Sequence, residues 1–106
     1  MSLDELSLSR LYDAPLEVPV HSEDDPTTGG VLPRFALMRP GSEPAGGDWT
    51  NGTWETTWSA DTELVTARTP QVNTTWPNLP RGKRVLWYTT TNTAEPSQRL
   101  AVITFT

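Results

Sequence analysis

The chain has 106 residues, a formal net charge of −5 at pH 7 and no cysteine. A chain of this length builds one domain around one hydrophobic core. The lack of cysteine excludes disulfides, cysteine-ligated zinc and thiol catalysis. The acidic balance argues against nucleic-acid binding, which requires a basic surface. Ten prolines and seven glycines, all after residue 14, leave no room there for a helix of ordinary length.

The first thirteen residues are the one segment compatible with a helix. Ser2 and Glu5 have capping-box spacing, and Leu3, Leu6 and Leu8 form a partial apolar stripe. The segment is too short to be a stable isolated helix. Two interpretations stay open: an arm that becomes ordered only against another surface, or a lead-in to the first strand.

The domain organisation follows from this division. We expect an N-terminal arm at residues 1–13 and a β-domain at residues 14–106. Acidic residues occupy the N-terminus where a secretory signal would be basic, and no apolar run is long enough to span a membrane. We therefore expect synthesis in a cytoplasm and no membrane partner.

Alternating apolar residues predict the strands of the first half of the β-domain. Pro15–Val20 is a strand whose two prolines favour an edge position. Val31–Arg39 is the second strand. Within Trp49–Trp58, the pair Asn51-Gly52 predicts a hairpin with a type I′ turn.

The second half continues the pattern. Glu63–Thr69 is a predicted strand, and a short strand fits Val72–Thr75. Val85–Thr91 is apolar on both faces, which is typical of a central strand, and Leu100–Thr106 closes the chain. About seven short strands separated by turn signals predict an all-β, immunoglobulin-like β-sandwich with a short N-terminal arm.

Polar clusters give no enzyme signature. The single histidine, His21, adjoins Glu23, Asp24 and Asp25. Nucleophilic catalysis would need a nucleophile held by this histidine, and no GxSxG motif is present. A calcium loop would need spaced oxygen ligands, whereas these acids are contiguous. We expect an exposed loop histidine, a solvated acidic turn, no catalytic residue, no metal and no cofactor.

The five tryptophans are the most informative residues. Trp87 lies in the doubly apolar strand and is expected in the core, and at least one of Trp54 and Trp58 is expected to pack inward. Trp49 and Trp76 flank turns and are the expected exposed pair. Exposed tryptophans serve protein interfaces or stack on sugar rings.

The chain also resembles a known family. The order DWTNGTWE, ELVTARTP and LPRGKRVLWYTTTNTAEPSQRLAVITFT is similar to small immunoglobulin-like proteins encoded among the virion structural genes of tailed phages that infect actinobacteria. The opening SRLYDAPLEVPV resembles that family's first strand. The matching features are Trp49–Trp58, Leu79–Gly82, Val85–Thr90, Asn92–Pro96 and Ala101–Thr104, with Asn92–Pro96 replacing a more compact acidic turn. The resemblance implies a β-sandwich in the virion and transfers no catalytic residue.

These observations predict a non-enzymatic structural protein of a tailed-phage particle, as a capsid decoration or as a head–tail, neck or tail component. The expected partners are other virion structural proteins and copies of the chain itself, with the virion as its location. The residues expected to make assembly contacts are Leu3, Leu6, Leu8, Trp49 and Trp76. The alternative is a carbohydrate-binding or adhesive module that uses exposed tryptophan, because a fold does not determine a function.

Overall fold

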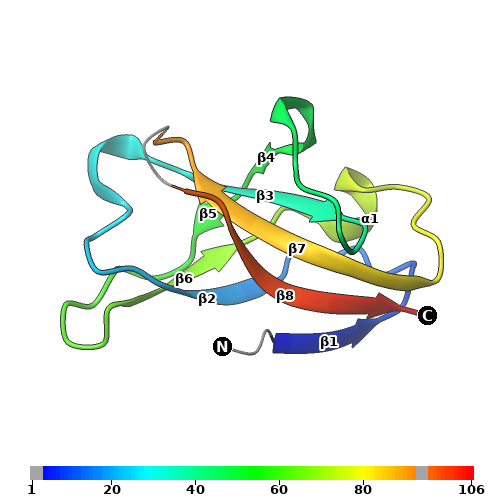
Figure 1. Ribbon diagram of the computed structural model, residues 1–106. Coiled ribbons are helices and arrows are strands. Elements are labelled where there is room, and N and C mark those ends of the chain that lie inside the picture. The colour runs from blue at the N-terminus through cyan, green and yellow to red at the C-terminus, as the bar shows by residue number, and fades with distance from the viewer. Residues whose placement is uncertain (1–3, 93–95) are drawn as a thin grey trace.

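The computed structural model describes residues 4–92 and 96–106, which form two β-sheets (Figure 1). The larger sheet has the strand order β1-β8-β7-β3-β4 and the smaller has the order β2-β6-β5. The strands are β1 (Asp4–Leu8), β2 (Glu17–His21), β3 (Pro33–Met38), β4 (Thr50–Asn51), β5 (Thr53–Trp54), β6 (Leu64–Arg68), β7 (Gly82–Thr90) and β8 (Gln98–Phe105). The helical turns are η1 (Thr28–Gly30), η2 (Gly46–Asp48) and α1 (Val72–Thr75). The prediction of an all-β sandwich is confirmed.

The core lies between the sheets and follows the alternation of the sequence. In β2, Val18 and Val20 are buried while the residues on either side of each are exposed. β7 is hydrogen-bonded to β3 and to β8, both antiparallel, which confirms it as a central strand. Its Leu86 and Tyr88 point into the core. β2 lies at the edge of the smaller sheet, as its prolines predicted.

The chain crosses from one sheet to the other at Gly52. β4 pairs with β3 in the larger sheet, whereas β5 pairs with β6 in the smaller one. The predicted type I′ hairpin is therefore wrong. That turn requires positive φ at both central residues, and neither Asn51 nor Gly52 has one. Gly52 is instead buried, and its N–H donates to the Pro33 carbonyl at 2.8 Å.

Within the helix-compatible N-terminal segment, Asp4–Leu8 form a strand rather than a helix. β1 lies parallel to β8 along the edge of the larger sheet (Figure 1), with Leu6 opposite Ile103 and Leu8 opposite Phe105. A short helix would have to form its hydrogen bonds within the segment itself, whereas here β8 supplies the hydrogen-bond partners of the backbone. Leu8 also packs against the core, as does Tyr12. The segment expected as an arm thus contributes to the sandwich from residue 4 onward.

The short strand fitted to Val72–Thr75 is also wrong, because these residues form the single helical turn α1. Val72 is buried and its N–H donates to the Ala14 carbonyl at 3.3 Å. The next two N–H groups donate to the Tyr12 carbonyl at 3.2 Å and to Asp13 Oδ1 at 2.7 Å. These acceptors, far away in sequence, outweigh the strand preference of a Val-Asn-Thr-Thr segment.

Gly52→Ala is expected to lower the free energy of unfolding by about 1–3 kcal/mol, the usual cost of overpacking. A Cβ at this position would meet the Arg68 carbonyl oxygen and would lie 2.6 Å from Cε2 of Phe35. Urea denaturation measures the change. Gly47→Ala is the matched control, because a Cβ there meets nothing within 4 Å. Equal stability of the two variants would contradict the close approach at residue 52.

Candidate functional site

Two of the five tryptophans tie loops to the sandwich through their indole N–H groups. The indole Nε1 of Trp54 donates to the Val31 carbonyl at 2.8 Å, and that of Trp58 donates to the Ser22 carbonyl at 3.0 Å. Both rings pack against the core. The prediction that at least one of the pair packs inward is confirmed, and each indole also ties a loop to the sandwich.

Trp87 is not in the core as predicted. It alternates with Leu86 and Tyr88, which point inward, so it lies half-buried on the outer face of the larger sheet. Its neighbours across the sheet are Ala36 on β3 and Arg99 on β8. The prediction failed because both faces of β7 are apolar, and alternation alone does not say which face meets the second sheet.

Trp49 and Trp76, the predicted exposed pair, line the same groove. Trp49 lies between η2 and β4, and Trp76 caps the C-terminal end of α1. Both are half-buried rather than exposed as predicted, and Trp76 also packs against the core. The groove has a volume of about 360 Å³ and is lined by Leu37, Gly47, Asp48, Trp49, Thr50, Thr75 and Trp76. Two residues that are distant in sequence therefore face one opening. We call it the tryptophan groove.

The tryptophan groove offers apolar and polar contacts together. The ring contacts among the described residues are Phe35–Tyr88 and Trp54–Tyr88, so the two groove indoles are not stacked on each other. The Asp48 carboxylate is held in place by the Ala45 N–H at 2.8 Å. The groove can therefore take an apolar or aromatic group and offer it a few hydrogen bonds.

The predicted leucines are separated by the structure. Leu3 lies outside the described residues, and Leu8 packs against the core. Leu6 is 37% exposed and lines a second groove of about 290 Å³ between β1 and β2. This edge groove is also lined by Glu5, Glu17, Val18, Pro19, Leu100 and Ala101. Of the three leucines, Leu6 is the one that the structure places at a surface.

The two lateral sides of the sandwich differ. On one side the chain itself runs from β4 to β5 through Gly52 and joins the sheets. On the other side β1 and β2 are the edges of separate sheets, with the edge groove between them. Pro19 removes one backbone donor from β2, whereas β1 contains no proline. An extended partner would find β1 the better edge for backbone pairing.

Sequence reasoning found the tryptophans of the groove but missed their neighbours. Asp48 precedes Trp49, and Thr75 precedes Trp76, so adjacency in the sequence was an available signal. No sequence pattern indicated that Leu37 of β3 would line the tryptophan groove, because its position there depends on how the loop after β3 folds back.

The acidic segment forms a solvated turn next to His21. The His21 imidazole is exposed and lies 3.9 Å from the Glu63 carboxylate. The hydroxyl and the backbone N–H of Thr27 both donate to Asp25 Oδ1, at 2.7 and 2.9 Å. These two hydrogen bonds hold the pKa of Asp25 below its ordinary value of 3.8.

Neither a metal cluster nor a membrane span is found in the described part of the chain. Within residues 4–92 and 96–106, no three His, Asp or Glu side chains gather closely enough to hold a metal ion. The helical turns of the same residues are too short to reach across a lipid bilayer.

Thr27→Val is expected to raise the pKa of Asp25 toward 3.8, because it removes the hydroxyl donor and keeps the backbone donor. The lowered pKa means that ionised Asp25 stabilises the fold above its unfolded-state pKa, and that this contribution disappears as the pH falls through the folded-state pKa. Carbon-detected NMR titration of the Asp25 carboxyl group measures the shift. An unchanged titration in the variant would contradict the role of the hydroxyl.

Trp54→Ala is expected to lower the free energy of unfolding by about 3 kcal/mol, because it opens a cavity and leaves the Val31 carbonyl without its indole donor. Trp49→Ala is expected to cost less than about 1 kcal/mol, because Trp49 lies outside the core cluster. Chemical denaturation of both variants checks the difference. Equal losses would mean that Trp49 belongs to the folding core.

Comparison of the chain with protein-family models, with characterised proteins and with solved structures gives no match. What the surface does is therefore inferred from its own residues and from the sequence resemblance described above.

Proposed function

We propose that this chain is a non-enzymatic structural protein of a tailed-phage particle that works by binding neighbouring proteins. It serves as a capsid decoration or as a head–tail, neck or tail component. Other virion proteins and further copies of the chain are its partners. The virion is its location, after synthesis in the host cytoplasm. The resemblance carried by the tryptophan segment and the two C-terminal strands suggests the particle.

We further propose that the sandwich is immunoglobulin-like, which the strand orders support. The order β2-β6-β5 corresponds to strands B-E-D of an immunoglobulin domain, and β8-β7-β3-β4 corresponds to G-F-C-C′. Phe35 is buried on β3, and in this correspondence β3 matches strand C, on which immunoglobulin domains carry a core tryptophan. The inter-sheet disulfide of antibodies has no counterpart, because the chain has no cysteine.

The single observation that carries the assembly role is the tryptophan groove. Trp49 and Trp76 both line one groove, where Trp76 also packs against the core, whereas the indole N–H groups of Trp54 and Trp58 are bonded within the fold. Aromatic side chains are enriched at the centres of protein interfaces, where they bury much area and lose little conformational entropy. The edge groove beside Leu6 supplies a second surface. Two separate surfaces suit a subunit that contacts more than one neighbour.

Carbohydrate binding is the second candidate, and the same groove favours it. Indole rings stack on the apolar faces of sugar rings, and the hydroxyls of Thr50 and Thr75 with the carboxylate of Asp48 could bond sugar hydroxyls. The protein interface is preferred because the family resemblance points to assembly.

The assembly role is tested in purified particles of the phage that encodes the chain. Mass spectrometry is expected to find the protein in a fixed ratio to the major capsid protein. In complementation, Trp49→Ala is expected to reduce incorporation by roughly tenfold or more, the usual effect of losing an aromatic hot spot. Leu64→Ala is the control, because Leu64 is an exposed apolar residue outside both grooves. Absence of the protein from particles would overturn the proposal.

A glycan titration separates the two candidates. A sugar-binding groove would shift the tryptophan fluorescence of the native protein, and Trp49→Ala would remove the shift. An assembly protein is expected to show no saturable change with mono- or oligosaccharides. A saturable, Trp49-dependent response would favour the adhesive module instead.

A further inference from the structure

β1 is an open edge of the larger sheet, and its hydrogen bonds determine which of its backbone groups face outward. The Thr106 N–H donates to the Leu8 carbonyl at 2.9 Å, and the Arg10 N–H donates to the Thr106 carbonyl at 3.0 Å. In a strand, the N–H and C=O of one residue point to the same side, and those of the next residue point to the other side. Leu8 therefore directs its backbone groups toward β8, whereas Glu5 and Ser7 direct theirs away from the sheet.

The outward backbone groups of Glu5 and Ser7 can accept a further strand. In the described part of the chain no strand lies beside them, because β1 ends the strand order of its sheet. Glu5, Leu6 and Ser7 are all exposed. Natural proteins often protect an edge with a proline or a bulge, and β1 has neither a proline nor a break in its pairing. An extended segment of another chain could therefore pair with β1.

The edge groove lies beside this open strand and has an apolar floor. Its apolar lining residues are Leu6, Val18, Pro19, Leu100 and Ala101. A regular strand would turn Leu100 and Ala101 to opposite faces, but the pairing of β7 with β8 skips Leu100. The extra residue lets both side chains line the groove. A strand added beside β1 would therefore cover apolar surface if its own apolar side chains faced Leu6.

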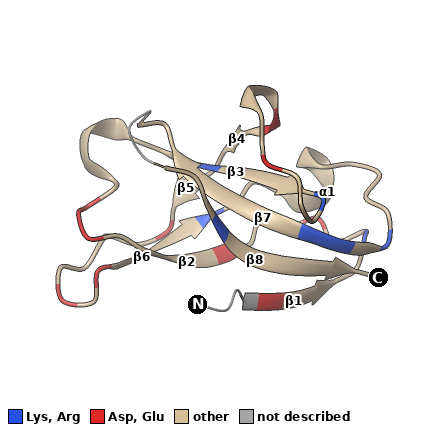
Figure 2. Cartoon of the chain, in the orientation of Figure 1, with Lys and Arg blue, Asp and Glu red and all other residues tan. Residues whose placement is uncertain are grey.

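The rim of the edge groove is acidic. Glu5 of β1 and Glu17 of β2 line the groove, and its lining contains no lysine, arginine or histidine. Within residues 4–92 and 96–106, neither carboxylate forms an ion pair. Figure 2 shows acidic residues on both β1 and β2. The carboxylates are therefore available to a cationic partner.

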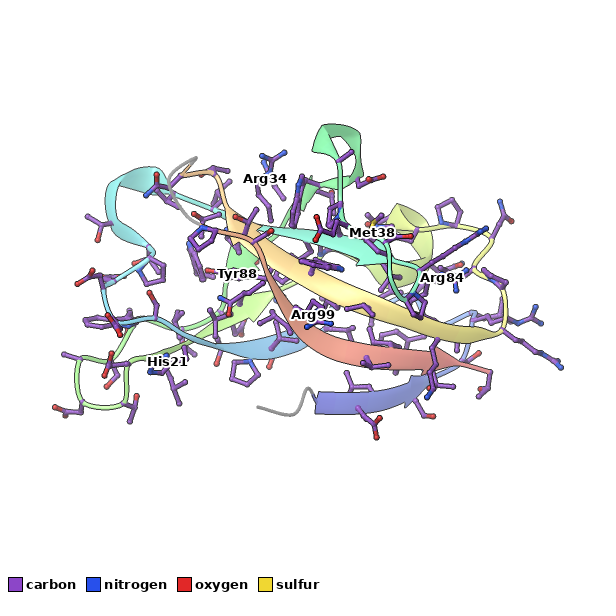
Figure 3. The ribbon with its side chains drawn as sticks, in the orientation of Figure 1. His21, Arg34, Met38, Arg84, Tyr88 and Arg99 are labelled. Carbon is purple, nitrogen blue, oxygen red and sulfur yellow. The ribbon has the colours of Figure 1, made fainter. Side chains whose placement is uncertain are left out.

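Two arginines on adjacent strands lie outside the edge groove. Arg68 of β6 is opposite Glu17 in the strand pairing, but its guanidinium forms an ion pair with Glu55 at 3.4 Å. Arg99, labelled on β8 in Figure 3, lines a different groove together with Trp87, on the outer face of the larger sheet. Available carboxylates beside an apolar floor favour a partner that carries both basic and apolar side chains.

A second copy of the chain does not have this chemistry. Two copies joined through their β1 strands would bring two acidic rims together, and each copy has a net charge of −5. The basic run Arg81–Arg84 is not free to act as an added strand, because Gly82–Arg84 belong to β7 and pair with β8. The occupant that fits the edge groove is therefore a segment of a different protein.

We propose that the edge groove binds an extended, basic segment of a neighbouring protein, which pairs with β1 as an added strand. The apolar side chains of the segment cover Leu6 and Val18, and its lysine or arginine side chains meet Glu5 and Glu17. Backbone pairing supplies affinity, and the alternating side chains supply specificity. This inference rests on the proposed assembly function and names the partner chemistry of one of its surfaces.

A peptide titration of the native protein tests the groove. The probe is a capped five-residue peptide of alternating lysine and valine, equal in length to β1. In ¹⁵N–¹H NMR spectra, the amide signals of Glu5 and Ser7 are expected to shift saturably, and binding is expected to weaken as salt is raised. The matched peptide with glutamate in place of lysine is expected not to bind. Equal binding of the two peptides, or no saturable shift on β1, would overturn the proposal.

The charge contribution is tested by Glu5→Gln/Glu17→Gln. This variant is expected to bind the lysine–valine peptide about three- to tenfold more weakly, because it removes both rim charges and keeps the side-chain shape. Glu23→Gln/Asp24→Asn is the matched control: it removes two exposed acids outside the edge groove and is expected to bind like the native protein. Equal weakening in both variants would mean that net charge alone attracts the peptide, which would contradict a specific site.

The backbone contribution is tested by Ser7→Pro. The ring removes an N–H that points away from β8, so the midpoint of urea unfolding is expected to stay near that of the native protein. Peptide binding is expected to weaken at least about fivefold, because the added strand loses one of its donors. Ser7→Ala keeps the N–H and is expected to bind like the native protein. A folded Ser7→Pro variant with native affinity would overturn strand addition at β1.

The virion test can fail without this one, and the reverse also holds. A protein that is absent from particles but binds the lysine–valine peptide through β1 keeps the edge-groove interface and loses the virion role. A protein that is present in particles but does not bind the peptide keeps its proposed function and loses this interface.

Discussion

An aromatic contact between the sheets is the interaction on which the other features depend. The ring of Phe35 on β3 lies 6.0 Å from that of Tyr88 on β7, and Tyr88 lies 6.5 Å from Trp54 on β5 in an edge-on arrangement. The first two residues belong to the larger sheet and the third to the smaller one. Such pairs add stability beyond the area that they bury. The missing side chain of Gly52 lets the backbone pass close to Phe35, so the crossing lies directly beside the aromatic contact.

The connection from β4 to β5 closes one lateral side of the sandwich and leaves the edge groove on the other side. Because β4 and β5 are continuous through Gly52, that side of the sandwich is joined, and the edge groove lies on the side of β1 and β2. The same crossing holds Trp54 inward while Trp49, five residues earlier, remains at the surface. The tryptophan segment therefore supplies both a core contact and a binding surface within a few residues.

Charged and apolar side chains share the grooves of this molecule. The tryptophan groove combines two indole rings with the Asp48 carboxylate, and the edge groove combines Leu6 with Glu5 and Glu17. Apolar contacts contribute most of the affinity of an interface, and complementary charges determine its orientation and speed of association. A subunit that must meet several neighbours in defined orientations needs both kinds of surface.

The sequence by itself determined the sandwich and its central strand, because a period of two with frequent prolines and glycines permits little else. It also singled out Trp49 and Trp76 from their places beside turns, but the fold half-buries both side chains and packs Trp76 against the core. Only the tertiary structure decided which face of β7 is the core, because Val85 and Trp87 are as apolar as Leu86 and Tyr88. Only long-range pairing made a strand of Asp4–Leu8 and a helical turn of Val72–Thr75, since their partners lie far away in the chain. The Asn51-Gly52 pair shows the limit of local reasoning. The same dipeptide suits a tight turn or a crossing, and the choice depends on which strand lies on each side of it.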